Sequence, residues 1–281
     1  MIDFLKYRRF YFLLSGLVIV VGLFSVWRFG FEYSIDFIGG GLIEYNYQKN
    51  TEPVKELFKQ YEDLSFQKTN HGFIVKGTKL DKKKAEQLDK KIKQKYQAKK
   101  KRFELVGPSV TRDNVIKIIN AALLSVLVIL IYIALSFKSW RFGLAAVVAL
   151  LHDTLILVGI WSILSHLFGV EVDVLFVTSV LTIMSFSVHD TIVIFDQIRE
   201  EEKQGTYQDT KDIINWSLNL TMARSINNSL TILLMLSALI VLGGESIRWF
   251  AVALLIGTLL GTYSSPFIAS PVYYLLVKKG K

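Results

Sequence analysis

Residues 174–199 have the sequence VLFVTSVLTIMSFSVHDTIVIFDQIR, an apolar segment that also carries ionisable side chains. Its first 23 residues exceed the roughly 20 helical residues that are needed to cross a bilayer core about 30 Å thick. This length predicts a membrane-spanning helix. Five further apolar segments predict additional spans at about residues 10–27, 115–137, 142–164, 226–244 and 249–277. We therefore expect an α-helical membrane protein with six transmembrane helices.

The composition of the 281-residue chain agrees with an alternation of apolar and charged blocks. Hydrophobic residues make up 52% of the chain, yet it also contains 33 Lys and Arg and 24 Asp and Glu. This mixture is a poor match to a soluble protein with one apolar core. The chain has no cysteine, which excludes disulfides and thiolate metal sites, and we expect no metal and no other cofactor.

Basic residues are distributed unevenly among the segments that connect the predicted spans. Lys and Arg near span ends are preferentially retained in the cytoplasm, and loops 165–173 and 243–248 together contain one basic residue, Arg248. Both termini are therefore predicted to be cytoplasmic. The first span is expected to be a retained anchor, because its apolar run is too long for a signal peptide and no Ala-x-Ala site follows. The basic residues assigned to the cytoplasmic side are Lys6, Arg8, Arg9, Lys138, Arg141, Arg199, Lys203, Lys211, Lys278, Lys279 and Lys281.

This topology places the long segment between the first two spans outside the cytoplasm. The predicted divisions are 1–28 for the N-terminus and first span, 29–112 for an extracytoplasmic domain, and 113–281 for spans two to six and the C-terminus. Strands are expected at 41–48, 64–68, 73–76 and 103–107, and helices at 52–61 and from residue 81, with a turn at 70–72. The order βαββαβ predicts a ferredoxin-like α+β domain.

The segment from Lys79 to Arg102 is strongly basic, with 12 Lys and Arg against three acidic residues. Basic helices are typical of nucleic-acid or anionic-lipid binding. Nucleic acid is not expected as a partner outside the cytoplasm. We favour a solvated face over a specific binding surface for substrate or lipid headgroups.

Ionisable residues within the spans are the strongest functional candidates. A charge near the bilayer centre costs at least about 2.5 kcal/mol, so such groups usually face a bundle interior or an aqueous path. His152 and Asp153 lie at the midpoint of the third span, and His189, Asp190 and Thr191 lie in the fourth. A proton path requires groups of this kind.

Helical spacing separates the candidates of the fourth span, because residues three or four apart share a face. Asp190 shares its face with Ser187, whereas His189 points elsewhere, so a direct His189–Asp190 couple is not expected. Asp196 and Arg199 are three apart near the cytoplasmic boundary. Their spacing favours a structural ion pair over a role in a proton path.

Arg224 lies before the predicted fifth span, where two roles are open. It could approach Asp190 when neighbouring helices move, since a buried carboxylate favours its neutral form until a cation arrives. It could instead be an ordinary positive-inside anchor. The residues alone do not favour either role.

The glycines of the chain predict packing and backbone freedom more than chemistry. Gly257 and Gly261 have the Gly-x-x-x-Gly spacing that allows close helix contact. Gly39, Gly40 and Gly41 precede a predicted strand. The chain has no phosphate-binding loop, Gly-x-Ser-x-Gly or HExxH motif, so we expect that it is not an enzyme. Any energy source is then an ion gradient or a nucleotide bound elsewhere.

Four motifs along the chain, taken together, resemble the SecF family of the SecD–SecF protein-export complex, a relative of the resistance-nodulation-division transporters. The motifs are residues 35–41 with Asp36, Gly39 and Gly40, the pair His152-Asp153, residues 190–200, and residues 261–265. The resemblance implies a multi-pass protein of the bacterial cytoplasmic (inner) membrane that pairs with SecD. It also implies proton-motive force as the energy source for late export steps that do not depend on SecA and ATP.

The resemblance further implies partners and residue roles. SecYEG, possibly with YajC and YidC, the translocating preprotein and membrane lipids are the expected partners. At the positions of Asp190 and Arg224, family members carry residues associated with proton conduction. The family commonly has Asn where this chain has His189, which adds a second titratable group and leaves H⁺ or Na⁺ as the coupling ion open.

The leading hypothesis is an export subunit in which protonation of Asp190 relaxes an interaction with Arg224 and moves the outer domain. One alternative is a small-molecule/proton antiporter, which efflux without an export defect would favour. The other is a passive scaffold of a translocation channel. A scaffold predicts that neutralising Asp190 has no effect provided that the complex assembles.

Overall fold

The computed structural model describes residues 2–47, 51–58, 61, 63–69, 72–137, 139–205, 207 and 209–278. The chain forms two compact units, one of Met1–Glu32 with Asn120–Lys281 and the other of Tyr33–Ile119. The second boundary falls inside one continuous helix, α5 (Pro108–Phe137). The domain limits expected at 29 and 112 therefore remain a prediction.

The first unit is built from long helices that cross-pack around two apolar cores. Six helical segments within the described residues are long and apolar enough to cross a membrane, which confirms the predicted number of spans. These segments are Phe4–Phe29, Val115–Phe137, Trp140–Phe168, Val174–Gln204, Thr210–Leu242 and Ile247–Lys278. Their elements are η1 (Phe4–Tyr7), α1 (Arg8–Phe29), α5, α6 (Trp140–Phe168), α7 (Val174–Gln204), α8 (Thr210–Leu242), α9 (Glu245–Ser264), η2 (Ser265–Ala269) and α10 (Ser270–Lys278).

Helix α8 is longer than the apolar pattern suggested. It begins at Thr210, capped by the Asp209 side chain, and not at residue 226. Asn, Ser and Arg residues lowered the hydropathy of its first half without interrupting the helix. Arg224 therefore lies about midway along α8, and the expectation that it lies at the mouth of the fifth span is wrong.

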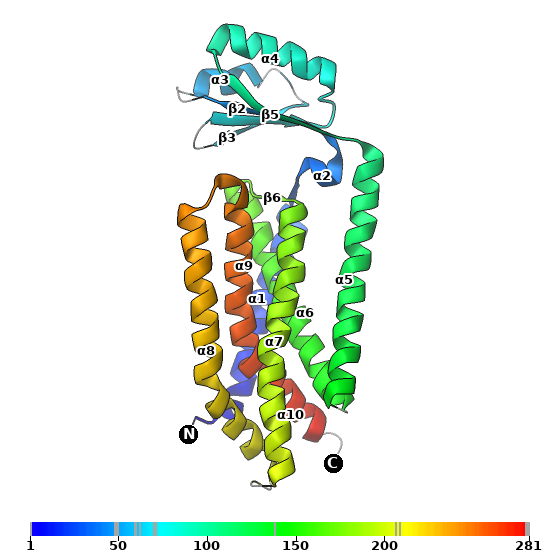
Figure 1. Ribbon diagram of the computed structural model, residues 1–281, viewed down its shortest axis with the longest axis vertical. Helices are drawn as coiled ribbons and strands as arrows, with labels where there is room; N and C mark the ends of the chain where they lie inside the picture. The colour runs from blue at the N-terminus through cyan, green and yellow to red at the C-terminus, as the bar shows by residue number, and fades with distance from the viewer. Residues whose placement is uncertain are drawn as a thin grey trace. The chain divides into compact units, whose positions relative to one another are not determined.

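Glycine contacts set how closely several helices approach. α9 packs against α6, α7 and α8 (Figure 1). A Cβ atom added at Gly257 would collide with the Ile183 side chain of α7, and one at Gly261 would lie 3.1 Å from the Ser187 Cα. Gly22 of α1 and Gly159 of α6 also lie in close contact, because a Cβ atom added at Gly22 would lie 3.0 Å from the Gly159 Cα. The predicted packing role of Gly257 and Gly261 agrees with these contacts.

The apolar pattern suggested that the sixth span is a regular α-helix, but the structure shows an interruption. A π-helical turn, η2, separates α9 from α10 and contains Pro266. The Ser265 carbonyl oxygen accepts both the backbone N–H of Ser270 and, at 3.1 Å, the Ser270 hydroxyl. Such π-bulges are frequent at functional sites.

The second unit contains a four-stranded antiparallel sheet with the order β3-β4-β2-β5. Helices α3 and α4 pack on it over a core that includes Ile43, Tyr45 and Phe73. The strands are β2 (Gly40–Asn46), β3 (Ser65–Thr69), β4 (Gly72–Gly77) and β5 (Lys99–Val106), and the helices are α3 (Glu52–Phe58) and α4 (Lys82–Tyr96). Two-residue strands β1 (Glu32–Tyr33) and β6 (Glu171–Val172) lie outside this sheet. Of the predicted turn 70–72, Asn70 and His71 lie outside the described residues.

The basic segment is divided between two elements. Strand β5 begins at Lys99, four residues before the predicted start at Phe103, so the last four basic residues are strand and not helix. Lys101 and Arg102 both contact Glu44 of the neighbouring strand β2, at 2.6 and 2.9 Å. Cross-strand charge pairing explains why so basic a sequence forms an edge strand.

The motif at residues 35–41 forms a short turn of helix, α2 (Ile35–Ile38), followed by a glycine corner. The Ser34 side chain caps α2, and its hydroxyl donates to Asp36 Oδ2 at 3.0 Å. Gly39 and Gly40 have φ angles of 74° and 116°, which side-chain-bearing residues rarely adopt. A Cβ at Gly40 would also collide with the Gly77 carbonyl oxygen, so this corner requires glycine.

Candidate functional site

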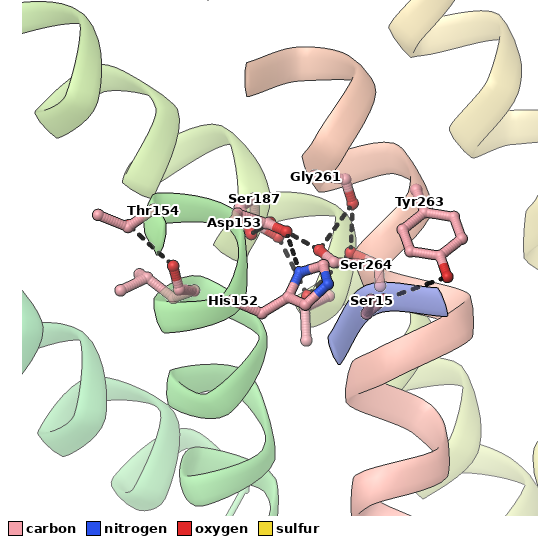
Figure 2. Close-up of polar contacts among 11 residues, drawn as sticks. Ser15, His152, Asp153, Thr154, Ser187, Gly261, Tyr263 and Ser264 are labelled. Atoms are coloured by element: carbon pink, nitrogen blue, oxygen red, sulfur yellow. Dashed lines mark hydrogen bonds and ion pairs between the residues drawn. The ribbon is translucent and has the colours of Figure 1, made fainter. Parts of the chain in front are cut away.

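A buried carboxylate lies at the junction of α6, α7 and α9. Asp153 is 1% exposed, and its Oδ2 accepts hydrogen bonds from Ser187 of α7 at 2.7 Å and Ser264 of α9 at 2.6 Å. Its Oδ1 lies 2.8 Å from Nδ1 of His152. Figure 2 shows these four side chains converging from the three helices. Asp153 therefore joins three spans through side chains of this chain alone.

The imidazole of His152 completes this cluster, but only one of its two ring nitrogens has a hydrogen-bond partner among the described residues. Its ring is 6% exposed, and within the described residues Nε2 has no hydrogen-bond partner. The ring faces that of Tyr263 with centroids 6.2 Å apart, and the Tyr263 hydroxyl lies 3.3 Å from the Ser15 hydroxyl of α1 (Figure 2). Polar groups thus continue from Asp153 towards the first span.

Thr191 connects α7 to the π turn. Its hydroxyl donates to the Ser187 carbonyl oxygen at 3.0 Å and lies 2.9 Å from the Ser265 hydroxyl. Ser265 in turn donates to the Gly261 carbonyl oxygen at 3.0 Å. Thr191 was predicted as a polar candidate, and the structure places it between the Asp153 cluster and the irregular part of the sixth span.

A second buried carboxylate, Asp190, lies on α7 and faces α8. It is 7% exposed, and its Oδ2 accepts a hydrogen bond of 2.6 Å from the Ser225 hydroxyl. Asp190 is thereby tied to one neighbouring helix, in contrast to the two joined by Asp153.

A small pocket opens beside Asp190. Its volume of about 20 Å³ is enough for one water molecule. Hydroxyl and amide side chains make up most of its polar wall, and Ser229 and Thr262 bond to each other across it at 2.6 Å. The lining residues are Phe186, His189, Asp190, Asn228, Ser229, Ile232, Thr258, Gly261 and Thr262. The pocket therefore leaves room for one water molecule beside Asp190.

Neither Arg224, the predicted partner of Asp190, nor His189 occupies the position of its hydroxyl partner Ser225. Arg224 is exposed on the surface of α8, and among the described residues no ion pair joins it to Asp190. Its sequence neighbour Ser225 makes the contact instead. His189 is also exposed, although it lines the pocket. The separation of His189 from a direct bond with Asp190 follows the helical geometry.

The predicted pair Asp196 and Arg199 is present near the end of α7. The Arg199 guanidinium contacts Asp196 Oδ1 at 2.7 Å and also donates to the Ser136 carbonyl oxygen of α5 at 2.9 Å. It thereby anchors the end of the second span to the fourth. It does not touch either buried carboxylate.

Sequence reasoning missed the hydroxyl partners of both carboxylates. Ser264 lies within the motif 261–265 and Ser225 directly follows Arg224, but neither had an assigned role. Ser187 was placed on the face of Asp190, yet its hydroxyl bonds to Asp153. A search for Ser and Thr within the predicted spans would have found Ser187 and Ser264, because hydroxyls there form hydrogen bonds between helices. It would have missed Ser225, which precedes the predicted fifth span at 226–244.

The comparisons with known proteins agree with this arrangement of spans and motifs. Residues 84–279 match the family described as protein export membrane protein SecD/SecF, C-terminal. The chain is 39% identical to the protein translocase subunit SecF of Thermobaculum terrenum, over 96% of this chain and 92% of that protein. It is 33% identical to the protein translocase subunit SecDF of Bacillus subtilis, over 99% of this chain but 38% of that longer protein.

Solved structures show the same similarity in three dimensions. The crystal structure of SecDF from Thermus thermophilus, a translocon-associated membrane protein, superimposes with a TM-score of 0.89 at 29% identity. The match covers all of this chain and 39% of the solved one. SecDF in the super-membrane-facing form gives a TM-score of 0.72 at 27% identity. With matches of this extent to SecF sequences and SecDF structures, the chain belongs to the SecD/SecF family of protein export membrane proteins.

Proposed function

We propose that this chain is the SecF-type subunit of a SecD–SecF complex that uses the proton-motive force to drive late steps of protein export. In this proposal those steps follow and do not depend on SecA and ATP. The observation that carries it is Asp190, a carboxylate almost fully buried in an apolar span, with one hydroxyl partner and a pocket for one water. Such a group can exchange a proton without dismantling the core around it.

The proposed cycle follows from the contact between Asp190 and Ser225. An ionised Asp190 accepts the Ser225 hydrogen bond and holds α7 against α8. A proton arriving from outside through the pocket removes the charge, weakens this bond, and allows α8 to shift. Arg224, which precedes Ser225, then changes its distance from Asp190 as α8 moves. Release of the proton to the cytoplasm restores the starting contact.

A SecD-like partner accounts for the polar surface that the spans leave exposed. Arg224, His189, Asn227 and Asn228 are exposed on α7 and α8 although both helices are membrane spans. Polar side chains facing hydrocarbon are unfavourable, so a second polar helix surface is expected to cover them. The Bacillus subtilis relative, named SecDF, is long enough to contain such a second half.

The remaining parts of the proposal concern placement and partners. The sheet order β3-β4-β2-β5 with two helices supports a ferredoxin-like domain, proposed to lie outside the cytoplasm and to contact the emerging preprotein or the SecD domain. Both termini are proposed to face the cytoplasm of a bacterium. The proposed partners are SecYEG, with YajC and YidC as further candidates, and membrane lipids. The chain is proposed to be neither an enzyme nor dependent on a cofactor, with H⁺ as the coupling ion.

The test is Asp190→Asn in vesicles that contain the assembled complex. Late-stage export of a precursor is measured with and without an imposed proton gradient, and Asp196→Asn serves as the control because Asp196 is a carboxylate on the same helix outside the pocket. We expect Asp190→Asn to lose the gradient-dependent stimulation and Asp196→Asn to keep it. Full stimulation in an assembled Asp190→Asn complex would favour the passive scaffold and reject the proposal. Arg224→Ala is expected to behave like Asp190→Asn.

A further inference from the structure

The positions of the protons in the cluster around Asp153 can be assigned from its hydrogen bonds, and the proposed cycle at Asp190 does not involve them. Two hydroxyl groups donate to Asp153 Oδ2, so no proton resides on that oxygen. The remaining proton of the cluster lies in the 2.8 Å contact between Asp153 Oδ1 and His152 Nδ1. With an ionised Asp153, which only accepts hydrogen bonds, this proton lies on Nδ1 and Nε2 carries a free lone pair.

Nε2 of His152 is therefore the atom at which the cluster can take up a further proton. It is buried, and among the described residues it is without a hydrogen-bond partner. Buried polar atoms are usually hydrogen-bonded, and an exception requires an explanation such as a chemical role. Transfer of a proton from a hydronium ion to Nε2 forms one N–H bond, breaks one O–H bond of the hydronium and leaves a water molecule, while the hydrogen bonds of the cluster stay in place. It changes the Asp153–His152 pair from a net negative charge to neutrality.

We propose that His152 is a second proton-accepting residue of the bundle, distinct from Asp190, with Nε2 as the acceptor and Asp153 as its carboxylate partner. The two sites lie on different contacts, since Asp153 joins α6, α7 and α9, whereas Asp190 faces α8. The proposal deepens the proton-coupled function above and rests on it for its role in export. The uptake of the proton itself does not depend on that role.

The groups that surround the pair leave His152 as its proton acceptor. α9 places the Tyr263 ring beside the imidazole, with its hydroxyl directed to Ser15 of α1. α7 contributes the Ser187 hydroxyl, while its carboxylate Asp190 bonds to Ser225 of α8. Two further polar groups on elements packed on α6 bond elsewhere: the Ser265 hydroxyl of η2 donates to the Gly261 carbonyl oxygen, and the Tyr273 hydroxyl of α10 donates to Glu202.

Protonation of His152 would affect the export cycle through hydrogen bonds made by α7. Ser187 bonds to Asp153 with its hydroxyl, and its carbonyl oxygen accepts the Thr191 hydroxyl one turn later. Asp190 lies between these two positions in the sequence. A change of charge at Asp153 and His152 therefore acts on the helical turn that carries Asp190 and on the π turn that Thr191 contacts.

The first experiment measures protonation directly, on the full chain in lipid nanodiscs with ¹⁵N-labelled histidine. The chain has four histidines, and the His152 signals are those that disappear in His152→Asn. We expect them to change from a neutral ring with a proton on Nδ1 to an imidazolium as the pH is lowered over the range in which the protein stays folded. A single unchanged form across this range would overturn the proposal.

The second experiment separates proton uptake from a structural role, in vesicles with the assembled complex. His152→Asn keeps a donor near the position of Nδ1 for Asp153 but removes Nε2, and His166→Asn is the matched control at an exposed position. We expect His152→Asn to lose most of the gradient-stimulated export and His166→Asn to retain it. Wild-type stimulation in His152→Asn would assign His152 a purely structural role and overturn its part in export. If wild-type vesicles show no stimulation, the proposed function fails, whereas the titration still decides whether His152 accepts a proton.

Discussion

Removing either hydroxyl from Asp153 should destabilise the helix bundle measurably. Ser187→Ala and Ser264→Ala each delete one donor to the same buried Oδ2 and leave the other in place. Hydrogen bonds to charged groups contribute about 1.5–3 kcal/mol, so each variant should lower the free energy of unfolding by about this amount. Ser185→Ala is the matched control, because Ser185 is exposed on the same helix as Ser187, and it should change stability by less than about 0.5 kcal/mol.

The double variant tests whether the two hydroxyls act on one oxygen. With both donors absent, Oδ2 is buried without compensation, so the loss should exceed the sum of the two single losses. The measurement is reversible unfolding in mixed detergent micelles, followed by tryptophan fluorescence, with the fully buried Trp161 as a reporter in the same bundle. Single variants as stable as Ser185→Ala would refute the claim that these hydroxyls hold the carboxylate. Strict additivity would refute the shared acceptor.

Two further predictions concern packing and the N-terminal contact. Gly257→Ala should destabilise the bundle by about 1–3 kcal/mol through collision with Ile183, whereas Gly16→Ala, which meets no atom within 4 Å, should not destabilise it, as the same unfolding assay would show. The hydrogen bond from Lys211 holds the pKa of Asp3 below its usual value, so its stabilisation is present above about pH 4 and is lost as the pH falls further. Asp3→Asn should remove this acid-dependent loss, which is at most about 1 kcal/mol for an exposed pair, in unfolding measured from pH 6 to pH 3.

Hydropathy predicted the spans because their length requirement leaves few alternatives. It failed where a helix carries polar residues for a tertiary reason. The first half of α8 contains Asn215 and Asn219, which bond to the N-terminal segment at Leu5 and Ile2, and so lowers the apolar score of a segment that is fully helical. The missed start of β5 has the same origin, since Lys101 and Arg102 are paired with Glu44 on the next strand.

The candidate carboxylates were found from sequence, but their partners were not. An acidic residue in an apolar span is conspicuous because of its cost, whereas Ser is common in membrane helices for packing reasons. Helical spacing relates residues on one helix only, so it could not show that Ser225 of α8 faces Asp190 or that Ser264 of α9 faces Asp153. The π turn at Ser265 also has no simple signature in the sequence, because Pro266 alone does not specify a widened turn.

The different surroundings of the two carboxylates indicate different roles. Both oxygens of Asp153 have partners within this chain, which fixes three helices in one arrangement. Asp190 has one hydroxyl partner, a pocket beside it, and the exposed cation Arg224 on the helix it faces. A carboxylate with few hydrogen-bond partners in its own chain can exchange those partners when it is protonated or when a neighbouring subunit binds. Asp190 is therefore the better candidate for the moving contact, and Asp153 for the fixed point that holds α6, α7 and α9 together while α8 moves.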